Sequence, residues 1–175
     1  LILFTDEVEK HVPAKKGKSH ALRLIRDILY YEPKGKKTSL KKALDFYYNV
    51  SKHSSVVFLI SDFYDTSSPM EYENSLKKVS KKHDLTSVRI RDLREAEIPY
   101  MGWIEMYDPE SGLFFSKDSS SYDFQNNFKK WNRDFEKEVS DMFLRCNVDT
   151  LEMWTHEDYQ KKLVNYFKAR KRKVK

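Results

Sequence analysis

The strongest hydrophobic pattern in the chain is the run VVFLI at residues 56–60, which is followed directly by Ser-Asp. A continuous apolar run of this length is typical of a strand that is buried on both faces, inside a parallel sheet covered by helices. A carboxylate is disfavoured in a strand and costly to bury. Asp62 at the end of the run is therefore expected to bind or stabilise something there. The pattern predicts a buried strand over 55–61.

The rest of the chain alternates between strand-like and helix-like patterns. Helical spacing of apolar residues predicts helices at 20–31, 40–48, 72–79, 124–142 and 163–167. Strands are expected over 1–4, 7–13, 85–92 and 148–155, with 85–92 nearer an edge of the sheet. Thr38 and Ser39 stand where the second helix needs an N-cap, and Pro69 where the third helix begins. This alternation predicts an α/β fold with a mostly parallel, doubly wound sheet flanked by helices.

One segment interrupts the alternation. Residues 102–118 hold two short strands about the turn DPESG, which indicates an inserted β-hairpin. The long helix that follows carries an aromatic stripe over 124–135. We expect that stripe to lie in the core, because apolar residues at this spacing form the buried face of an amphipathic helix.

Composition narrows the functional classes. The 175 residues contain 33 Lys and Arg against 27 Asp and Glu, and much of the excess lies at 14–18 and 168–175. A net charge of +6 allows acidic partners such as nucleic acid or an anionic membrane surface. Cys146 is the only cysteine, which excludes an internal disulfide and fits a reducing compartment. No apolar stretch approaches the roughly 18 residues of a membrane span.

Few residues suggest chemistry. With four glycines the chain has neither a phosphate-binding loop nor a dinucleotide fingerprint, and its five histidines form no pair at metal-ligand spacing. Asp62 and Thr38 are the exceptions, because ligands of open α/β sheets bind beyond the carboxyl ends of the strands. Their oxygens suit Mg²⁺ or Mn²⁺. The alternative is structural: Asp62 caps the turn after its strand, and Thr38 caps its helix.

Several stretches together carry a family resemblance. They are LILFTDEVEKHVPAKKGKSHALRLIRDIL (1–29), GKKTSLKKALDF (35–46), VVFLISDF (56–63), HDLTSVRIRDLREAEIP (83–99) and IEMYDPESG (104–112). In order and spacing the chain resembles the bacterial domain-of-unknown-function 58 family, a branch of the von Willebrand factor A-like domains. The resemblance implies a Rossmann-like sheet that carries a metal-ion-dependent adhesion site.

Such a site has three parts, of which this sequence matches two. Thr38 matches the threonine of the second part and Asp62 the aspartate of the third, while Ser39 and Asp65 beside them are expected to contact a partner. The Asp-x-Ser-x-Ser loop of the first part is missing. In the family's layout the strand before that loop lies at the centre of the sheet, between 1–4 and 56–61. The resemblance therefore implies a domain over 1–167 that is incomplete at its N-terminus.

Two functional hypotheses follow. The resemblance implies a non-enzymatic adaptor that works with a MoxR-type AAA+ ATPase, in the cytoplasm or at the cytoplasmic face of the membrane. Mg²⁺ would bind the full-length protein and bind weakly or not at all here. The alternative is a nucleic-acid-binding protein or a metal-dependent nuclease that uses Asp62 with the basic runs. For this second role the residues 168–175 form a solvated basic tail, whose charges are Lys168, Arg170, Lys171, Arg172, Lys173 and Lys175.

Overall fold

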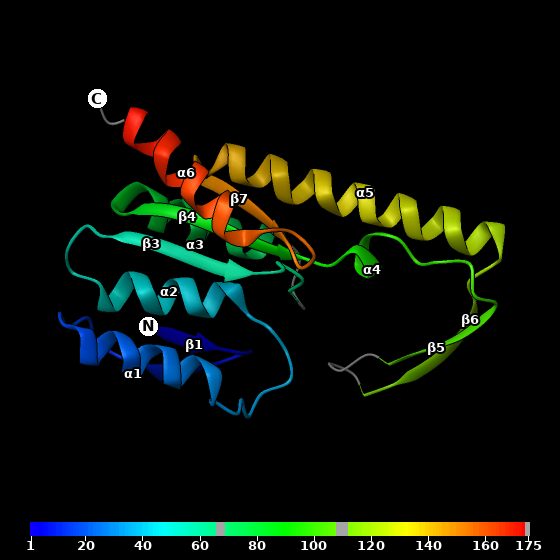
Figure 1. Cartoon of the computed structure of the whole chain (residues 1–175), viewed down its shortest axis with the longest axis horizontal. Helices are drawn as coiled ribbons and strands as arrows, with labels where there is room; N and C mark the ends of the chain where they lie inside the picture. The colour runs from blue at the N-terminus through cyan, green and yellow to red at the C-terminus, as the bar shows by residue number, and fades with distance from the viewer. Residues whose placement is uncertain (66–68, 108–111, 174–175) are drawn as a thin grey trace.

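A computed structural model describes residues 1–65, 69–107 and 112–173 of the chain (Figure 1). Its strands are β1 (Ile2–Phe4), β2 (Val8–His11), β3 (Val56–Ser61), β4 (Asp84–Arg91), β5 (Trp103–Tyr107), β6 (Phe114–Asp118) and β7 (Asp149–Trp154). Its helices are α1 (Lys18–Leu29), α2 (Leu40–Val50), α3 (Pro69–Lys82), α4 (Leu93–Ala96), α5 (Tyr122–Arg145) and α6 (Tyr159–Lys173). No described helix is both long enough and apolar enough to cross a bilayer.

The strands form three separate groups. The largest is a parallel sheet in the order β3-β4-β7, with Val56 opposite Asp84 and Thr86 opposite Asp149. β1 pairs with β2, and β5 pairs with β6, each antiparallel. The predicted α/β architecture, with a parallel sheet flanked by helices, is confirmed for these three strands. Residues 108–111 of the predicted DPESG turn lie outside the described part of the chain.

Helices cover both faces of the parallel sheet. The main core joins residues of α2, α3 and α5 to one face of the sheet, and its members include Leu40, Leu44, Leu59, Phe63, Tyr72, Leu76, Val79, Leu85, Val139, Met142 and Phe143. A smaller cluster on the opposite face packs Val88, Leu151 and Met153 against α6. α2 and α3 begin where local signals predict, since Ser39 Oγ accepts the N–H of Lys42 at 3.4 Å and α3 starts at Pro69.

The positions of β3 and β4 reverse the prediction. β3 lies at one edge of the parallel sheet, and the side chains of Val56 and Ile60 remain 59% and 61% exposed. β4 is the central strand, although it alternates apolar with polar residues. Its polar side chains can be buried because each finds a partner: Ser87 Oγ, for example, donates to Thr150 Oγ1 at 3.1 Å.

The aromatic stripe of α5 joins the core only at its C-terminal end, where Phe135 packs against the main cluster. Only the C-terminal half of α5 packs on the sheet, through Val139, Met142 and Phe143, and the N-terminal half extends beyond it toward the β5–β6 hairpin (Figure 1). Trp131, in the middle of the stripe, is exposed. Its ring lies parallel to that of Tyr64, with centroids 5.9 Å apart.

The C-terminal helix extends further than expected. α6 continues to Lys173, so the basic run after residue 167 prolongs the helix. Arg170 is half-buried and folds back on the sheet, where it forms an ion pair with Asp84 and donates to Thr86 Oγ1 at 2.6 Å. The expectation of a solvated tail is therefore wrong at Arg170, because its guanidinium binds side chains of β4.

Candidate functional site

The loop after β3 holds the first candidate residue. Asp62 is exposed at the carboxyl end of the strand, as expected, and its Oδ1 accepts the backbone N–H of Tyr64 at 3.1 Å. Ser61 Oγ accepts the N–H of Phe63 at 3.0 Å. These bonds close a tight turn of the kind that Asp and Ser side chains stabilise. The capping role that the sequence left open for Asp62 is thus present.

Phe63 gives this turn an unusual backbone. Its φ is 67°, in the left-handed region that bulky residues rarely adopt, and its side chain is fully buried. The ring meets that of Phe143 edge-on, with centroids 4.9 Å apart. Burial of the ring offsets the backbone strain, and such strain is often found where a chain presents a functional group. The residue directly before this position is Asp62.

Asp65 and the start of α2 form the second part of the site. Asp65 Oδ2 accepts the N–H of Leu40 at 2.7 Å, and this N–H is one of the helix-start groups that lack a partner within the helix. Thr38 and Ser39, both half-buried, lie directly before it. The structure thus joins Asp65 to the Thr38–Ser39 segment. A carboxylate at a helix N-terminus is also favoured by the helix dipole.

These residues do not complete a metal site. No group of three or more His, Cys, Asp or Glu side chains in the described ranges is placed to hold a metal ion. Mg²⁺ takes six oxygen ligands in octahedral geometry, and Asp62 and Thr38 could supply only two of them. The described residues by themselves therefore do not fit a Mg²⁺ centre.

The structure contains an ion-pair network beneath the loop that the sequence did not predict. Arg89 is almost fully buried and makes two bonds to the Glu136 carboxylate, at 2.7 and 2.9 Å. Arg91 joins the same carboxylate at 2.8 Å. The Nε of Arg89 lies 3.5 Å from the backbone oxygen of Asp62, so the network also supports the turn. The only signal in the sequence is the alternation RIR, which puts both arginines on one face of β4.

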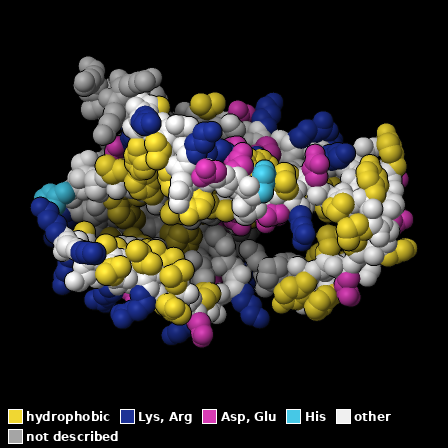
Figure 2. Space-filling model, viewed as in Figure 1, with side chains coloured by type: hydrophobic (Ala, Val, Ile, Leu, Met, Phe, Trp, Pro, Cys, Tyr) yellow, Lys and Arg dark blue, Asp and Glu magenta, His cyan; other side chains and the backbone are white. Residues whose placement is uncertain are grey.

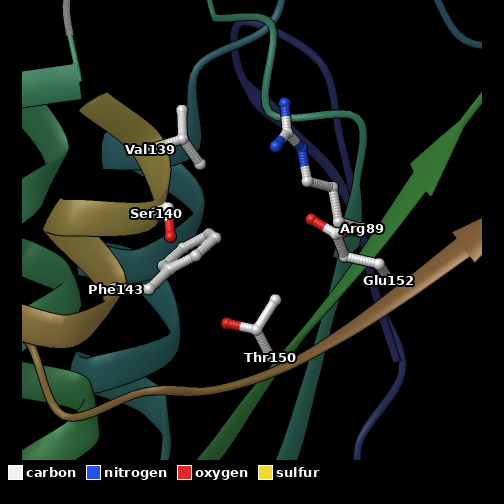
Figure 3. Close-up of a pocket in the computed structure, with 6 residues that line it drawn as sticks. All are labelled: Arg89, Val139, Ser140, Phe143, Thr150 and Glu152. Carbon is white, nitrogen blue, oxygen red and sulfur yellow. The ribbon is translucent and has the colours of Figure 1, made fainter. Parts of the chain in front are cut away.

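A small cavity lies next to this network (Figure 3). Its volume is about 230 Å³, and its lining residues are Arg89, Val139, Ser140, Phe143, Thr150 and Glu152. This is smaller than the 300–1,000 Å³ or so of typical small-molecule pockets. The guanidinium of Arg89 is already paired with Glu136, and no His or Cys lines the cavity. The other polar side chains that line it are those of Ser140, Thr150 and Glu152.

An exposed apolar surface lies away from these residues, at the β5–β6 hairpin and the start of α5. We call the β5–β6 hairpin together with the N-terminal half of α5 the aromatic arm. Its exposed apolar side chains are Tyr100, Met101, Trp103, Tyr107, Leu113, Phe114, Phe115, Tyr122 and Trp131. Figure 2 shows hydrophobic side chains gathered along this part of the molecule, on the right of the view.

Two buried amides attach the arm to the body. Gln125 donates to the backbone oxygens of Ile98 and Ser119 at 2.9 and 2.8 Å. Asn132 donates to the oxygens of Glu95 and Ala96 at 3.2 and 3.0 Å. Three of these bonds join α5 to the segment that runs from α4 toward the hairpin, and the bond to Ser119 joins it to the residue after β6. The arm is therefore a defined structure, and its apolar side chains are exposed even so.

Comparison with known proteins gives one family and several relatives. A family model described as "Protein of unknown function DUF58" matches residues 1–138. "Uncharacterized protein Rv1480" of Mycobacterium tuberculosis is 25% identical over 165 residues, which cover 92% of this chain and 50% of that protein. "Uncharacterized protein MAV169" of Mycobacterium avium is equally similar, and there the match covers 94% of the relative.

The chain thus spans about half the length of the first of these relatives and nearly all of the second. No solved structure matches the chain at a significant level. The match of the family model over residues 1–138 agrees with the resemblance carried by the motifs between Leu1 and Gly112. The chain belongs to the family described as protein of unknown function DUF58.

Proposed function

We propose that this chain is part of a protein-interaction domain that acts as a non-enzymatic adaptor for a MoxR-type AAA+ ATPase. The observation that supports it best is the aromatic arm. Aromatic residues and Met are enriched in protein interfaces, and large exposed apolar patches mark interaction sites. Trp103, at the start of β5, is 78% exposed.

The pairing and the side chains of the β5–β6 hairpin support the same proposal. β5 and β6 pair only with each other among the described strands. One face of the hairpin carries Trp103, Tyr107 and Phe114, and the other carries Ile104, Met106 and Phe115. An isolated two-stranded hairpin is at best marginally stable in water. A hairpin with apolar side chains on both faces gains stability when a partner covers it.

For the residues at the carboxyl end of β3, the proposal concerns the full-length protein. We place the chain in a von Willebrand factor A-type, Rossmann-like fold, in which Asp62 and Thr38 contribute to a Mg²⁺ site together with residues outside 1–175. Such an ion would accept a partner's carboxylate, with Ser39 and Asp65 beside it. Residues 1–175 alone should bind Mg²⁺ weakly, so a calorimetric titration showing tight, stoichiometric binding would count against this part of the proposal.

The arm is tested by binding to a purified MoxR-type AAA+ ATPase. The double variant Trp103→Ser/Phe114→Ser removes two exposed rings, and Tyr159→Ser removes an exposed ring on α6 as the matched control. We expect the double variant to weaken binding at least tenfold, or by about 1.4 kcal/mol, in biolayer interferometry. The control should bind like the parent chain.

Two results would contradict the proposal. The first is equal ATPase binding by the double variant, the control and the parent chain. The second is salt-dependent binding to duplex DNA with no binding to the ATPase, which would favour the nucleic-acid alternative. Thermal melts of all three proteins establish that the comparison is made between folded chains.

A further inference from the structure

The β5–β6 hairpin has two open edges. β5 and β6 pair with each other and with no other described strand. Such a two-stranded hairpin is at best marginally stable in water, and a stable sheet usually needs three or more strands. Figure 1 shows the hairpin beyond the parallel sheet, at the right of the molecule. Its edges therefore lie where a second molecule can reach them.

The base of the hairpin is held in a defined position. The Oγ of the buried Ser119 accepts the N–H of Met101 at 2.9 Å and donates to the backbone oxygen of Gly102 at 2.8 Å. Ser120 Oγ accepts the N–H of Gly102 at 3.1 Å. These bonds join the two ends of the hairpin, so its edges belong to an ordered structure.

One backbone hydrogen bond shows which groups of β6 point outward. By the register of the two strands, Gly102 lies opposite Ser119. The Ser119 N–H donates to the Gly102 oxygen at 2.8 Å, so these residues form a hydrogen-bonded pair. Hydrogen-bonded and non-hydrogen-bonded pairs alternate along an antiparallel ladder. The backbone groups of Phe114, Ser116 and Asp118 therefore point away from β5.

The two edges of the hairpin differ in charge and in exposure. By the same alternation, the backbone groups of Trp103, Glu105 and Tyr107 form the edge of β5. Glu105 is at the middle of that edge, whereas the uncharged Ser116 is at the middle of the β6 edge. Residues 114–117 of β6 are all exposed, while β5 alternates between exposed and half-buried residues. β6 is therefore the more accessible edge.

We propose that two copies of this chain associate through their β6 edges, as antiparallel strands related by a twofold axis at Ser116. The two hairpins then form one four-stranded sheet, which satisfies the outward backbone groups of both β6 strands. The contact is isologous, so the assembly closes at two copies. The dimer needs no ATPase and so goes beyond the proposed adaptor role.

The side chains of β6 suit pairing with a second copy of the same strand. About this axis, Phe114 lies opposite Asp118 of the second copy. Phe115 lies opposite Lys117 of the second copy, and a cation beside an aromatic ring is a favourable contact. The same arrangement of two β5 strands would place Glu105 opposite Glu105, which is unfavourable. The β6 edge is therefore the one that fits a second copy.

The surface at this edge sets the strength of the dimer. Phe114 and Phe115 are 65% and 40% exposed, and an aromatic side chain buries about 150–250 Å² when it is fully covered. With the two strand backbones, these rings give an interface on the order of 1,000 Å² or less, in the range of weak and transient complexes. We therefore expect a dissociation constant of roughly 10–100 µM.

Sedimentation velocity at about 5 to 500 µM protein measures this association. Ser116→Pro removes an outward N–H of β6 and no bond to β5, since edge strands tolerate Pro at such positions. Glu105→Pro is the matched control, because it removes the equivalent N–H from the β5 edge. We expect Ser116→Pro to weaken the dimer at least about tenfold and Glu105→Pro to associate like the parent chain.

Amide exchange locates the contact without any substitution. Between dilute and concentrated protein, the amides of Phe114 and Ser116 should become protected, because groups of the second copy accept them. The amides of Glu105 and Tyr107 should not change. Thermal melts of the dilute proteins show whether each Pro variant keeps the fold, and the exchange of the parent chain decides the matter if Ser116→Pro does not.

Three results would overturn the proposed dimer. One is a parent chain that stays monomeric over the whole range, including the case in which the β6 amides are protected only by added ATPase. Another is equal association of folded Ser116→Pro and the parent chain. The third is loss of association in Glu105→Pro as well, which would mean that β6 binds β5 of the next copy in an open-ended assembly.

Discussion

β3 and β4 are neighbours in one parallel sheet, but the relation between polarity and burial is opposite in the two strands. β3 is almost entirely apolar, yet Val56, Phe58 and Ile60 are exposed. β4 carries Thr86, Ser87 and Arg89, yet all three are buried. The polar strand can be central because residues of other elements form hydrogen bonds or ion pairs with these buried polar side chains. The apolar strand is at the edge because nothing in the described chain lies against its outer side.

The difference shows that burial depends on partners supplied from elsewhere in the sequence. Arg89 is buried against Glu136, 47 residues later, and Thr86 against Tyr166 and Arg170 of α6. A buried charge without such a partner would cost several kcal/mol. β3 has no such partners among the described residues on its outer face, where Val56, Phe58 and Ile60 stay exposed.

The largest expected effect is on β4. Arg89→Ala removes the guanidinium that holds Glu136 and supports the turn at Asp62, and leaves the carboxylate with Arg91 alone. Breaking a buried pair costs about 3–5 kcal/mol of unfolding free energy, and the value here should lie near the lower end because Glu136 is partly exposed. Urea denaturation measures it.

The matched control is Arg133→Ala, on the exposed side of α5. Its effect should stay within about 0.5 kcal/mol. If the two variants unfold at the same urea concentration, the buried ion pair does not stabilise the fold. The proposed difference between β4 and β3 would then be wrong.

Adjacent residues of β3 should differ strongly. Leu59 is buried in the main core, so Leu59→Ala should cost about 2–5 kcal/mol. Ile60, the next residue, is exposed, so Ile60→Ala should cost less than about 1 kcal/mol in residues 1–175. Thermal unfolding of the two variants distinguishes them. Equal losses would mean that the outer face of β3 is already covered.

The pH dependence tests the buried polar groups at the start of both strands. His83 precedes β4, and its Nδ1 lies 3.1 Å from Ser55 Oγ, just before β3. Burial, and to a lesser extent the charge of Lys82, lowers the pKa of His83. Below the ordinary histidine pKa of about 6.5 the unfolded chain takes up a proton that the folded chain resists. Stability should therefore fall as the pH drops from about 6.5 toward the lowered pKa.

The measurement compares the urea midpoints of the parent chain and His83→Asn at pH 7.5 and 5.5. Asn keeps a polar group near Ser55 but does not titrate in this range. The variant should lose less stability between the two pH values than the parent chain does. An identical loss in both proteins would assign the pH dependence to other groups.

The smallest expected change in stability is at the end of β3. Asp62→Asn keeps the shape of the side chain and an oxygen that can accept the N–H of Tyr64. Stability should change by less than about 1 kcal/mol, as is usual for exposed positions. Binding of the full-length protein to the proposed ATPase partner should weaken much more. If the variant unfolds as readily as Leu59→Ala, Asp62 is a structural cap and the proposed site fails.

The sequence by itself determined the features that depend on local signals. Ser39 caps α2, Pro69 begins α3, and the spacing of Tyr72, Leu76 and Val79 selects the buried face of that helix. The exposed Asp62 at a strand end was also predictable, because a carboxylate directly follows an apolar run. Each of these follows from residues within a few positions of one another.

Only the tertiary structure decided which strand is central and which residues support the site. The Arg89–Glu136 pair, the Asp65–Leu40 bond and the Phe63–Phe143 contact each join residues far apart in the chain. The apolar run of β3 likewise predicts that the strand should be covered, but not what covers it. Pairing partners are set by long-range contacts that local patterns do not encode, so the edge position of β3 became visible only in three dimensions.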